Sequence, residues 1–375
     1  MLRAEEQFAW MALSRAPELD VPCISLALDS LGGLDGLVNA SDAARRGAGI
    51  PEAAGEFLSC LGKSPSSTER AWVAGANHHL VPFTDPRYPA SLCVLHPMPI
   101  ALYVIGNAEL LNEPQLSIVG SRNPTPAGRD IAFRFAESLA ALGLCITSGL
   151  AEGIDSAAHR GALAAQGTTI AVLGSGLDII YPKNNRALSE EISLRGALIS
   201  EFPLGTPPRR ENFPQRNRII AGMSLGTLVV EAARRSGSLI TARIAGDHNR
   251  ELFAVPGSIH NPLSRGCHEL IRQGAKLTET TADILSELNF SDFFQRLRAA
   301  SGGSGGPPGI EAGMDKAHKI LLDALGFDPA DLDVLVVRTG FKPEAVSSMM
   351  LILELEGHVQ AAPGGRYSRV VRSRR

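Results

Sequence analysis

The chain has 375 residues, of which 44% are hydrophobic and 20% charged, and its formal net charge is −3. This length exceeds one ordinary domain, and the near-neutral charge excludes a protein that is basic over its whole surface. Any site for a polyanion must therefore be a local patch.

Cysteine spacing and hydropathy indicate the compartment. The five cysteines are scattered and form no CxxC pair, a pattern typical of reduced thiols rather than of disulfides or a zinc site. Residues 1–20 lack the apolar core of a signal peptide, and no apolar run approaches the roughly 18 residues of a membrane span. We therefore expect a cytoplasmic protein without membrane contact.

The first 80 residues are rich in Ala, Leu and Gly, and their apolar periodicity predicts short helices, for example over 8–16 and 23–33. We expect a small helical domain over 1–80, similar to SAM or helix-hairpin-helix modules. Residues 85–90 and 98–106 are interpreted as an extended lead-in to the next domain.

Residues 81–298 show a different pattern, in which short Ile- and Val-rich runs alternate with helix-compatible segments. The runs occupy 116–120, 144–149, 168–174, 197–202, 226–231, 251–256 and 275–279. Such alternation is typical of βαβ units and of a parallel sheet covered on both faces. The sequence therefore predicts an α/β fold with a Rossmann-like, doubly wound parallel sheet.

The C-terminal part begins with a linker over 299–309, which is rich in Gly, Ser and Pro and cannot bury a core. Residues 310–375 follow, with three helical segments and two strand-like runs around Pro363-Gly364-Gly365. This order predicts a winged-helix domain.

The loops after the predicted strands carry the candidate binding residues, because ligands of open parallel sheets bind beyond the carboxyl ends of the strands. Glycines let backbone N–H groups approach phosphate, and basic side chains add charge. A single loop of this kind could equally be a tight turn, but their repetition favours phosphate binding. The candidates are Gly120, Ser121, Arg122, Gly149, Lys183, Asn185, Arg210 and Arg243.

Motifs for common cofactors are missing from these loops. The segment after Gly120 is not GxGxxG, and no GxxxxGK[ST] motif occurs in the chain. We expect no dinucleotide cofactor, no ATP hydrolysis and no other cofactor.

Two acidic residues lie near the predicted strand ends. Asp155 and His159 are one helical turn apart, but two ligands are too few for a metal site. Asp155 is interpreted as a helix cap or loop-bracing residue, with catalysis as the alternative. Glu231 ends a predicted strand and is interpreted as a loop brace or as a general base.

Several long motifs over residues 80–290 occur in a fixed order: SIVGSRNPTPAG, TSGLAEGIDSAAHRGAL, AVLGSGLDIIYPKNN, SEFPLGTPP, NFPQRNRIIAGMSLGTLVVEAARRSGSLITA and VPGSIHNPLSRGCHELIRQGA. Together they closely resemble the DNA-processing protein A (DprA/Smf) family. The resemblance implies a non-catalytic core that binds and protects incoming single-stranded DNA and loads the RecA recombinase during natural transformation. It also implies a homodimer through the core, around 258–275.

The resemblance places the DNA pocket on Arg122, Lys183, Arg210, Phe213 and the run Arg216, Asn217 and Arg218. Single-strand binders combine a cationic groove with aromatic faces, and Phe213 is flanked by arginines. Phe213 either stacks on a base or packs into the core as a hydrophobic staple, and both interpretations stay open.

The alternative function is that of a nucleotide-processing hydrolase of the lysine-decarboxylase-like type. Those proteins carry a PGGxGTxxE loop, whereas this chain has Met223-Ser224-Leu225 before Gly226-Thr227. The catalytic loop is therefore incomplete.

The predicted recognition helix of the winged-helix domain, 343–357, contains glutamates and no basic residue, which disfavours duplex reading. The basic tail is either a solvated terminus or a nucleic-acid contact; its arginines are Arg366, Arg369, Arg372, Arg374 and Arg375.

Overall fold

The chain divides into two units, Met1–Asp292 and Phe293–Arg375. The computed structural model describes residues 2–60, 65–288, 321–322, 324–325, 330–355, 358–362 and 366–369. The predicted linker over 299–309 and the tail arginines from 372 onward lie outside the described residues. The N-terminal helices and the central sheet belong to the same unit.

The N-terminal helices begin where the sequence provides capping side chains. They are α1 (Ala4–Arg15), α2 (Val21–Leu31), α3 (Leu34–Asn39), α4 (Asp42–Gly47), α5 (Glu52–Cys60) and α6 (Ser67–Val73). Asp20, Ser41 and Ser66 each accept a hydrogen bond from the first turn of the helix that follows, which satisfies an otherwise free N–H group.

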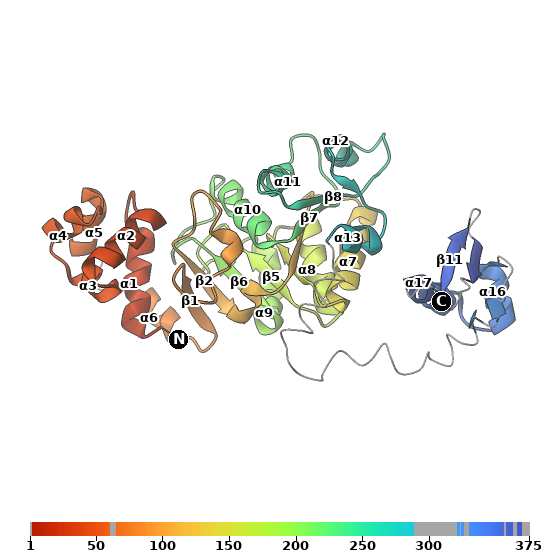
Figure 1. Ribbon diagram of the computed structural model, residues 1–375, viewed down its shortest axis with the longest axis horizontal. Helices are drawn as coiled ribbons and strands as arrows, with labels where there is room; N and C mark the ends of the chain where they lie inside the picture. The colour runs from red at the N-terminus through yellow and green to blue at the C-terminus, as the bar shows by residue number, and fades with distance from the viewer. Residues whose placement is uncertain are drawn as a thin grey trace, which may run out of the picture. The chain divides into compact units, whose positions relative to one another are not determined.

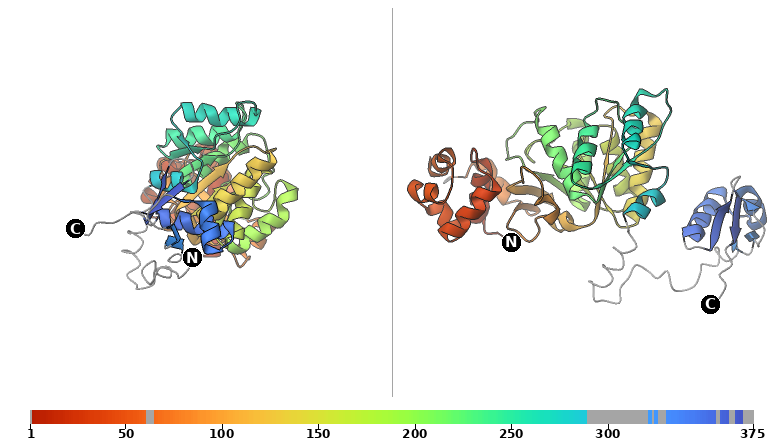
Figure 2. Two further views of the ribbon diagram at one scale, coloured as in Figure 1. Left: turned by 90° about the vertical axis from the view of Figure 1, so that its right-hand side faces the viewer. Right: turned by 45° about the horizontal axis from the view of Figure 1, so that its top comes forward.

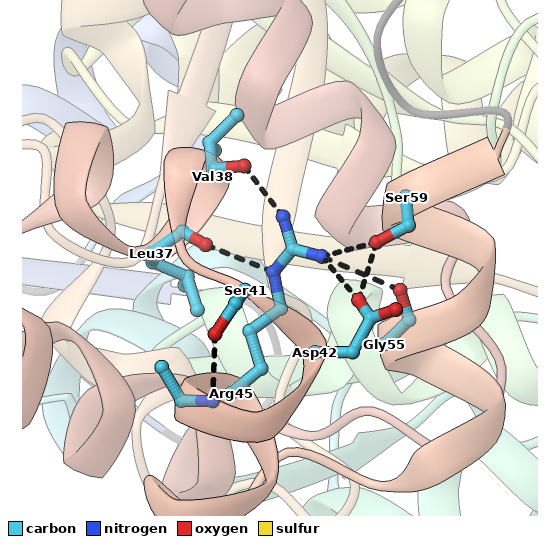
Figure 3. Close-up of polar contacts among 8 residues, drawn as sticks. Leu37, Val38, Ser41, Asp42, Arg45, Gly55 and Ser59 are labelled. Atoms are coloured by element: carbon cyan, nitrogen blue, oxygen red, sulfur yellow. Dashed lines mark hydrogen bonds and ion pairs between the residues drawn. The ribbon is translucent and has the colours of Figure 1, made fainter.

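A buried arginine holds three of these short helices together. Arg45 is 1% exposed. Its guanidinium donates to the carbonyls of Leu37 (3.1 Å) and Val38 (2.5 Å), and to Asp42 (3.1 Å) and Ser59 (2.6 Å), as Figure 3 shows. Because these partners come from α3, α4 and α5, one paired charge joins helices that are too short to bury a large core of their own.

The N-terminal helices also share their core with the sheet. Trp10 and Leu37 belong to the same buried cluster as Leu80 and Leu198, and the ring of Trp72 meets that of Tyr103 edge-on at 5.4 Å. Figure 1 shows these red and orange helices beside β1 and β2. The helical segment expected over 1–80 therefore packs on the core and is not a separate unit.

Within the described residues, nine strands form one sheet. They are β1 (His78–Pro82), β2 (Ala101–Gly106), β3 (Gln115–Val119), β4 (Cys145–Ser148), β5 (Thr169–Val172), β6 (Ala197–Ser200), β7 (Gly226–Val229), β8 (Glu251–Ala254) and β9 (Lys276–Leu277). Their order is β1-β2-β6-β5-β4-β3-β7-β8-β9. In this order, every pair of neighbouring strands from β6 through β5, β4, β3, β7 and β8 to β9 is parallel. The pairs β1–β2 and β2–β6 are antiparallel.

The structure confirms the predicted Rossmann-like parallel sheet and extends it by two antiparallel strands. Residues 98–106 were expected as a lead-in, but 101–106 form β2, which pairs with β6 nearly a hundred residues later. No local pattern signals such a long-range pairing, because an isolated apolar run is compatible with several partners.

Helices connect the parallel strands and cover both faces of the sheet. They are α7 (Pro126–Ala141), α8 (Ile154–Ala164), α9 (Arg186–Arg195), α10 (Asn212–Met223), α11 (Ser238–Asp247), α12 (Arg265–Arg272) and α13 (Thr281–Glu287). Right-handed crossovers place α7–α9 on one face and α10–α12 on the other, since the chain winds in opposite directions from β3 and β7. Figures 1 and 2 show the yellow to yellow-green α7 and α8 on one side of the strands and the green to blue-green α10 and α11 on the other.

The described part of the C-terminal unit follows the predicted winged-helix order; most of the first predicted helix lies outside the described residues. It contains β10 (Ala330–Asp331), α16 (Leu332–Thr339), α17 (Pro343–Leu355), β11 (Val359–Ala362) and β12 (Arg366–Arg369), with sheet order β10-β12-β11. Leu335, Val346, Met350 and Leu353 are buried in its core. The hairpin turn over 363–365 lies outside the described residues.

Among the described residues, no helix combines the length and the apolar character that crossing a bilayer requires.

Candidate nucleic-acid interface

The winding of the sheet reverses between β3 and β7, and this reversal leaves a crevice at their carboxyl ends. A cavity of about 810 Å³ lies there. We call it the strand-end cavity. Its described lining includes Gly120–Asn123, Asp155, Tyr181, Arg210, Phe213, Pro214, Arg216, Asn217 and Ser236–Ser238. Arginines outnumber carboxylates in this lining, where Asp155 is the single acidic side chain described.

Arg122 is exposed on the loop after β3, and tight packing beneath it holds that loop. The Ser121 carbonyl accepts a hydrogen bond from Ile154 N (3.1 Å) at the start of α8. Gly153 has φ +87°, and a Cβ there would lie 2.4 Å from the Ser121 oxygen. Only glycine allows this approach, so the loops after β3 and β4 are locked together and present Arg122 to the cavity.

Phe213, on the first turn of α10, is half-buried beneath the arginine. The Arg122 guanidinium lies 5.1 Å from its ring centroid, within range of a cation–π contact. A Cβ at Gly174 would lie 3.1 Å from Cδ1 of Phe213, so the ring also packs on the loop after β5. The ring therefore packs under the arginine in this structure, and base stacking on Phe213 stays a prediction.

Arg216 lines the cavity but is only 4% exposed. Its Nη1 donates to the carbonyl oxygens of Gly149 (2.6 Å) and Val172, at the ends of β4 and β5. Burial lowers the pKa of Arg216 to about 10, and the negative charge of Asp155 opposes that shift. The structure therefore corrects the expectation of a free DNA-contacting cation: Arg216 braces two strand ends.

Arg218 lies away from the site. It is 7% exposed and forms an ion pair with Glu201, and it does not occur among the described residues that line the cavity. Burial raises the pKa of Glu201 to about 7. Residues two positions apart in an α-helix differ by about 200° around the helix axis. Arg218 therefore points away from the side of α10 that Arg216 occupies. The expected DNA contact by Arg218 is therefore corrected as well.

Three other predicted residues do not belong to the described lining of the strand-end cavity. Asn185 is buried and donates to the Leu150 carbonyl (2.8 Å) and to Ser156 Oγ (2.9 Å), so it fixes a loop and does not face the cavity. Lys183 is exposed in the short 3₁₀ turn Lys183–Asn185, outside the described lining. Arg243 is exposed on α11 and lines an adjoining groove of about 640 Å³, which shares Ser236, Gly237 and Ile240 with the strand-end cavity.

The remaining predicted residues are close to the cavity. Gly120, Ser121, Arg210 and Asn217 line it, and the Asn217 amide donates to the Gly237 carbonyl at 3.4 Å. Gly149 lies directly beneath the Arg216 guanidinium, where a Cβ would be 2.5 Å from Nη2. Bulk at Gly149 is therefore incompatible with the position of Arg216.

Two acidic side chains hold the loops that shape the cavity. Asp155 accepts from the backbone N–H groups of Gly149 (3.2 Å) and Ala151 (3.4 Å). Glu231 accepts from Thr125 N (2.8 Å) and Thr125 Oγ1 (2.7 Å). Both residues are 7% exposed. The two donors to Asp155 share its Oδ2, whereas Thr125 occupies both carboxylate oxygens of Glu231. This arrangement is that of loop braces.

His159 is completely buried, and its side chain makes a single described hydrogen bond, between Nδ1 and Thr169 Oγ1 at 2.7 Å. The Thr169 hydroxyl already donates to the Ile146 carbonyl, so Nδ1 carries the hydrogen. Burial lowers the pKa of His159 from 6.5 to about 3. Among the described residues, no three His, Cys, Asp or Glu side chains converge as a metal site would require.

Replacing His159 with Asn should flatten the acid side of the stability profile. Between about pH 3 and 6.5 the unfolded chain binds a proton that the folded chain does not, so stability falls as the pH falls. Asn can keep the donor to Thr169 without titrating. The unfolding free energy of the wild type should then fall relative to His159→Asn by up to about 1.4 kcal/mol per pH unit. Urea titrations from pH 4.5 to 7.5 measure this difference, and parallel profiles would contradict it.

Tyr181 was missed by the sequence analysis although it lines the cavity. Its ring centroid lies 5.8 Å from that of Phe213, at 46°. In the sequence Tyr181 differs from an ordinary loop residue only in being aromatic, whereas Lys183 two positions later carries the charge that a phosphate site needs. The two rings are more than thirty residues apart in the sequence, one in a loop and the other at the start of α10, so no local spacing predicts that they pair.

Comparison with known proteins gives consistent similarities. A family model described as DNA recombination-mediator protein A matches residues 79–289, and a model of the DprA winged helix domain matches 306–365. Protein Smf of Escherichia coli K12 is 44% identical over 310 residues, which are 82% of each chain. DNA processing protein DprA of Streptococcus pneumoniae R6 is 45% identical over 206 residues, 55% of this chain and 73% of that one.

Two solved structures are similar in fold as well. DNA processing protein A from Streptococcus pneumoniae has a TM-score of 0.65 and 35% identity, covering 76% of this chain and 99% of that one. The protein from Helicobacter pylori, whose structure concerns its single-stranded DNA binding mode, has a TM-score of 0.51 and 32% identity, covering 54% and 93%.

Proposed function

The chain belongs to the DNA recombination-mediator protein A (DprA/Smf) family, and on this premise we propose that it binds single-stranded DNA in the strand-end cavity. The observation that carries the proposal is the exposed Arg122, which lies over Phe213 inside this cavity. A cation for the phosphates next to aromatic surface for the bases is the combination that single-strand binders use.

The electrostatics of the cavity support an anionic ligand. The net charge of the chain is −3, yet Arg122 and Arg210 are exposed in the lining, where the single described carboxylate is the buried Asp155. Glycine-containing loops at the ends of parallel strands add backbone N–H groups that phosphate oxygens can accept from. A flexible polyanion fits this open surface better than a compact cofactor does.

The biological role we propose is that of the family: protecting incoming DNA and loading RecA on it in natural transformation, in the cytoplasm. The chain would act as a homodimer through residues 258–275. Ile259 in that segment is 73% exposed, so its apolar side chain is accessible to a second copy of the chain. Sedimentation at rising protein concentration tests the dimer, and fluorescent RecA on protein-coated oligonucleotides tests loading.

DNA binding itself is tested by fluorescence anisotropy with labelled dT oligonucleotides of several lengths and with duplexes of equal length. We expect tighter binding to single strands, increasing with length and decreasing linearly in log–log plots against salt. Equal affinity for duplex and single strand, or no binding, would contradict the proposal.

Glu231 distinguishes this role from the nucleotide hydrolase. Replacing Glu231 with Gln should lower the unfolding free energy by about 1–3 kcal/mol, because an amide N–H₂ then faces one of the Thr125 donors. Free base release from nucleoside monophosphates should be undetectable for both proteins. Base release by the wild type that is lost in Glu231→Gln, at unchanged stability, would instead identify Glu231 as a catalytic base.

A further inference from the structure

Glu152 is an exposed acidic side chain beside the arginine of the proposed DNA site. It lines a small cavity of about 80 Å³, which adjoins the strand-end cavity and is also lined by Arg122 and Phe213. Among the ion pairs of the described residues, none involves Glu152. A carboxylate at this place opposes the binding of any phosphate, because like charges repel.

The backbone on both sides of Glu152 is fixed. The Ala151 N–H group donates to the Asp155 carboxylate at 3.4 Å. Gly153 has φ +87°, and a Cβ there would lie 2.4 Å from the Ser121 oxygen. Since the chain is held before and after Glu152, the loop carries this side chain at a defined point of the cavity wall.

The contacts of Glu152 do not require a negative charge. Its Oε1 accepts a hydrogen bond from Asn184 Nδ2 at 2.9 Å, which joins the loop after β4 to the 3₁₀ turn Lys183–Asn185. An amide oxygen accepts such a hydrogen bond equally well, and both side chains are exposed. A glutamine would therefore hold the two loops together, and the charge of the glutamate has no structural role in this contact.

The charge of Glu152 acts on phosphates according to their own charge. In a cavity of this size, a phosphate held by Arg122 lies within about 10 Å of the Glu152 carboxylate, the Debye length at 0.1 M salt, so the repulsion is only partly screened. A phosphodiester inside a strand carries one negative charge, whereas a phosphate monoester carries about 1.5 to 2 at pH 7. The repulsion is therefore up to about twice as large for the monoester.

We propose that Glu152 is a selectivity residue, which makes the site prefer the phosphodiesters of a strand to dianionic phosphate monoesters such as free nucleotides. The inference rests on the proposed single-stranded DNA function and adds a class of ligand that the site rejects. Arg122 supplies the attraction that both ligands share, and Glu152 supplies the repulsion by which they differ.

The test compares the wild type with Glu152→Gln in the full chain. Ligand-observed NMR titrations measure binding of thymidine 5′-monophosphate and of its methyl ester, which differ by one phosphate charge, and fluorescence anisotropy measures binding of a dT oligonucleotide. Removing the carboxylate should strengthen binding of the ester and of dT roughly 2- to 5-fold, and binding of the monophosphate roughly 4- to 25-fold.

Glu56→Gln is the matched control. Glu56 is exposed on α5 and lies outside the described linings of both cavities, so its replacement removes the same formal charge without changing the site. It should leave all three affinities unchanged. Equal gains in Glu56→Gln and Glu152→Gln would mean a diffuse effect of net charge and would reject the inference.

Other outcomes separate the inference from the DNA-binding function. Equal gains for monophosphate and ester in Glu152→Gln would show that the carboxylate does not discriminate phosphate charge, and unchanged or weaker binding of both would show that it does not oppose phosphate; either result overturns the inference. If dT binds the wild type in these cases, the DNA-binding function stands. If dT does not bind but the monophosphate gains more than the ester, the selectivity of Glu152 stands and the proposed DNA function is rejected.

Discussion

Replacing Arg216 with Ala is expected to lower the free energy of unfolding by about 3–5 kcal/mol. The guanidinium is 4% exposed and donates to the carbonyls of Gly149 and Val172. Its removal leaves these oxygens without that donor and leaves the buried Asp155 carboxylate without the positive charge that faces it. The loss should therefore appear as instability of the whole parallel sheet rather than as a weaker ligand contact alone.

Urea unfolding followed by circular dichroism measures this effect. Arg210→Ala is the matched control, because Arg210 lines the same cavity but is exposed, and its removal should change stability by no more than about 0.5 kcal/mol. Arg216→Lys keeps the charge but loses the planar guanidinium. Its free energy of unfolding should therefore lie between those of the wild type and Arg216→Ala. An Arg216→Ala protein as stable as the wild type but defective in DNA binding would show that Arg216 is a ligand contact after all.

Replacing Arg122 with Ala is expected to weaken single-stranded DNA binding by roughly 10- to 150-fold, the value of a charge-assisted hydrogen bond of about 1.5–3 kcal/mol. One phosphate contact fewer should also reduce the slope of log affinity against log salt by about 0.7. Arg122 is exposed and its guanidinium only covers Phe213, so we expect little change in stability.

The two readouts of this experiment are independent. Anisotropy titrations at four or five salt concentrations give affinity and slope, and urea unfolding checks the fold. Arg160→Ala is the control, because Arg160 is exposed on α8 and lies outside the described lining of the cavity. It removes the same formal charge from the chain. Equal losses in both variants would mean a diffuse effect of net charge and would contradict a local phosphate contact at Arg122.

Much of the architecture could be predicted from local patterns. The runs 116–120, 144–149, 168–174, 197–202, 226–231, 251–256 and 275–279 all contain all or most of a strand. The five strands from β3 to β7 are buried along their length, and buried parallel strands need uninterrupted apolar residues whatever their neighbours are. The winged-helix order followed from helix periodicity and a glycine-rich turn. By contrast, β2 pairs with the distant β6, and no property of its own residues reveals that partner.

The candidate site could be predicted only in outline. Loops that follow parallel strands must meet at one edge of the sheet, so the sequence alone determined that Gly120, Arg122 and the segment 210–217 lie near one another. It could not distinguish Arg216 from Arg122, since both are arginines in segments that follow predicted strands.

What the sequence by itself determined about this protein is therefore the fold and the edge of the sheet that carries the site. The tertiary structure decided which side chains face the cavity. Arg216 and Arg218 are buried because the rotation of α10 directs one toward the ends of β4 and β5 and the other toward Glu201. Tyr181 lies beside Phe213 because the loop after β5 meets the first turn of α10 there. Exposure depends on long-range neighbours, and residue type and spacing do not record them.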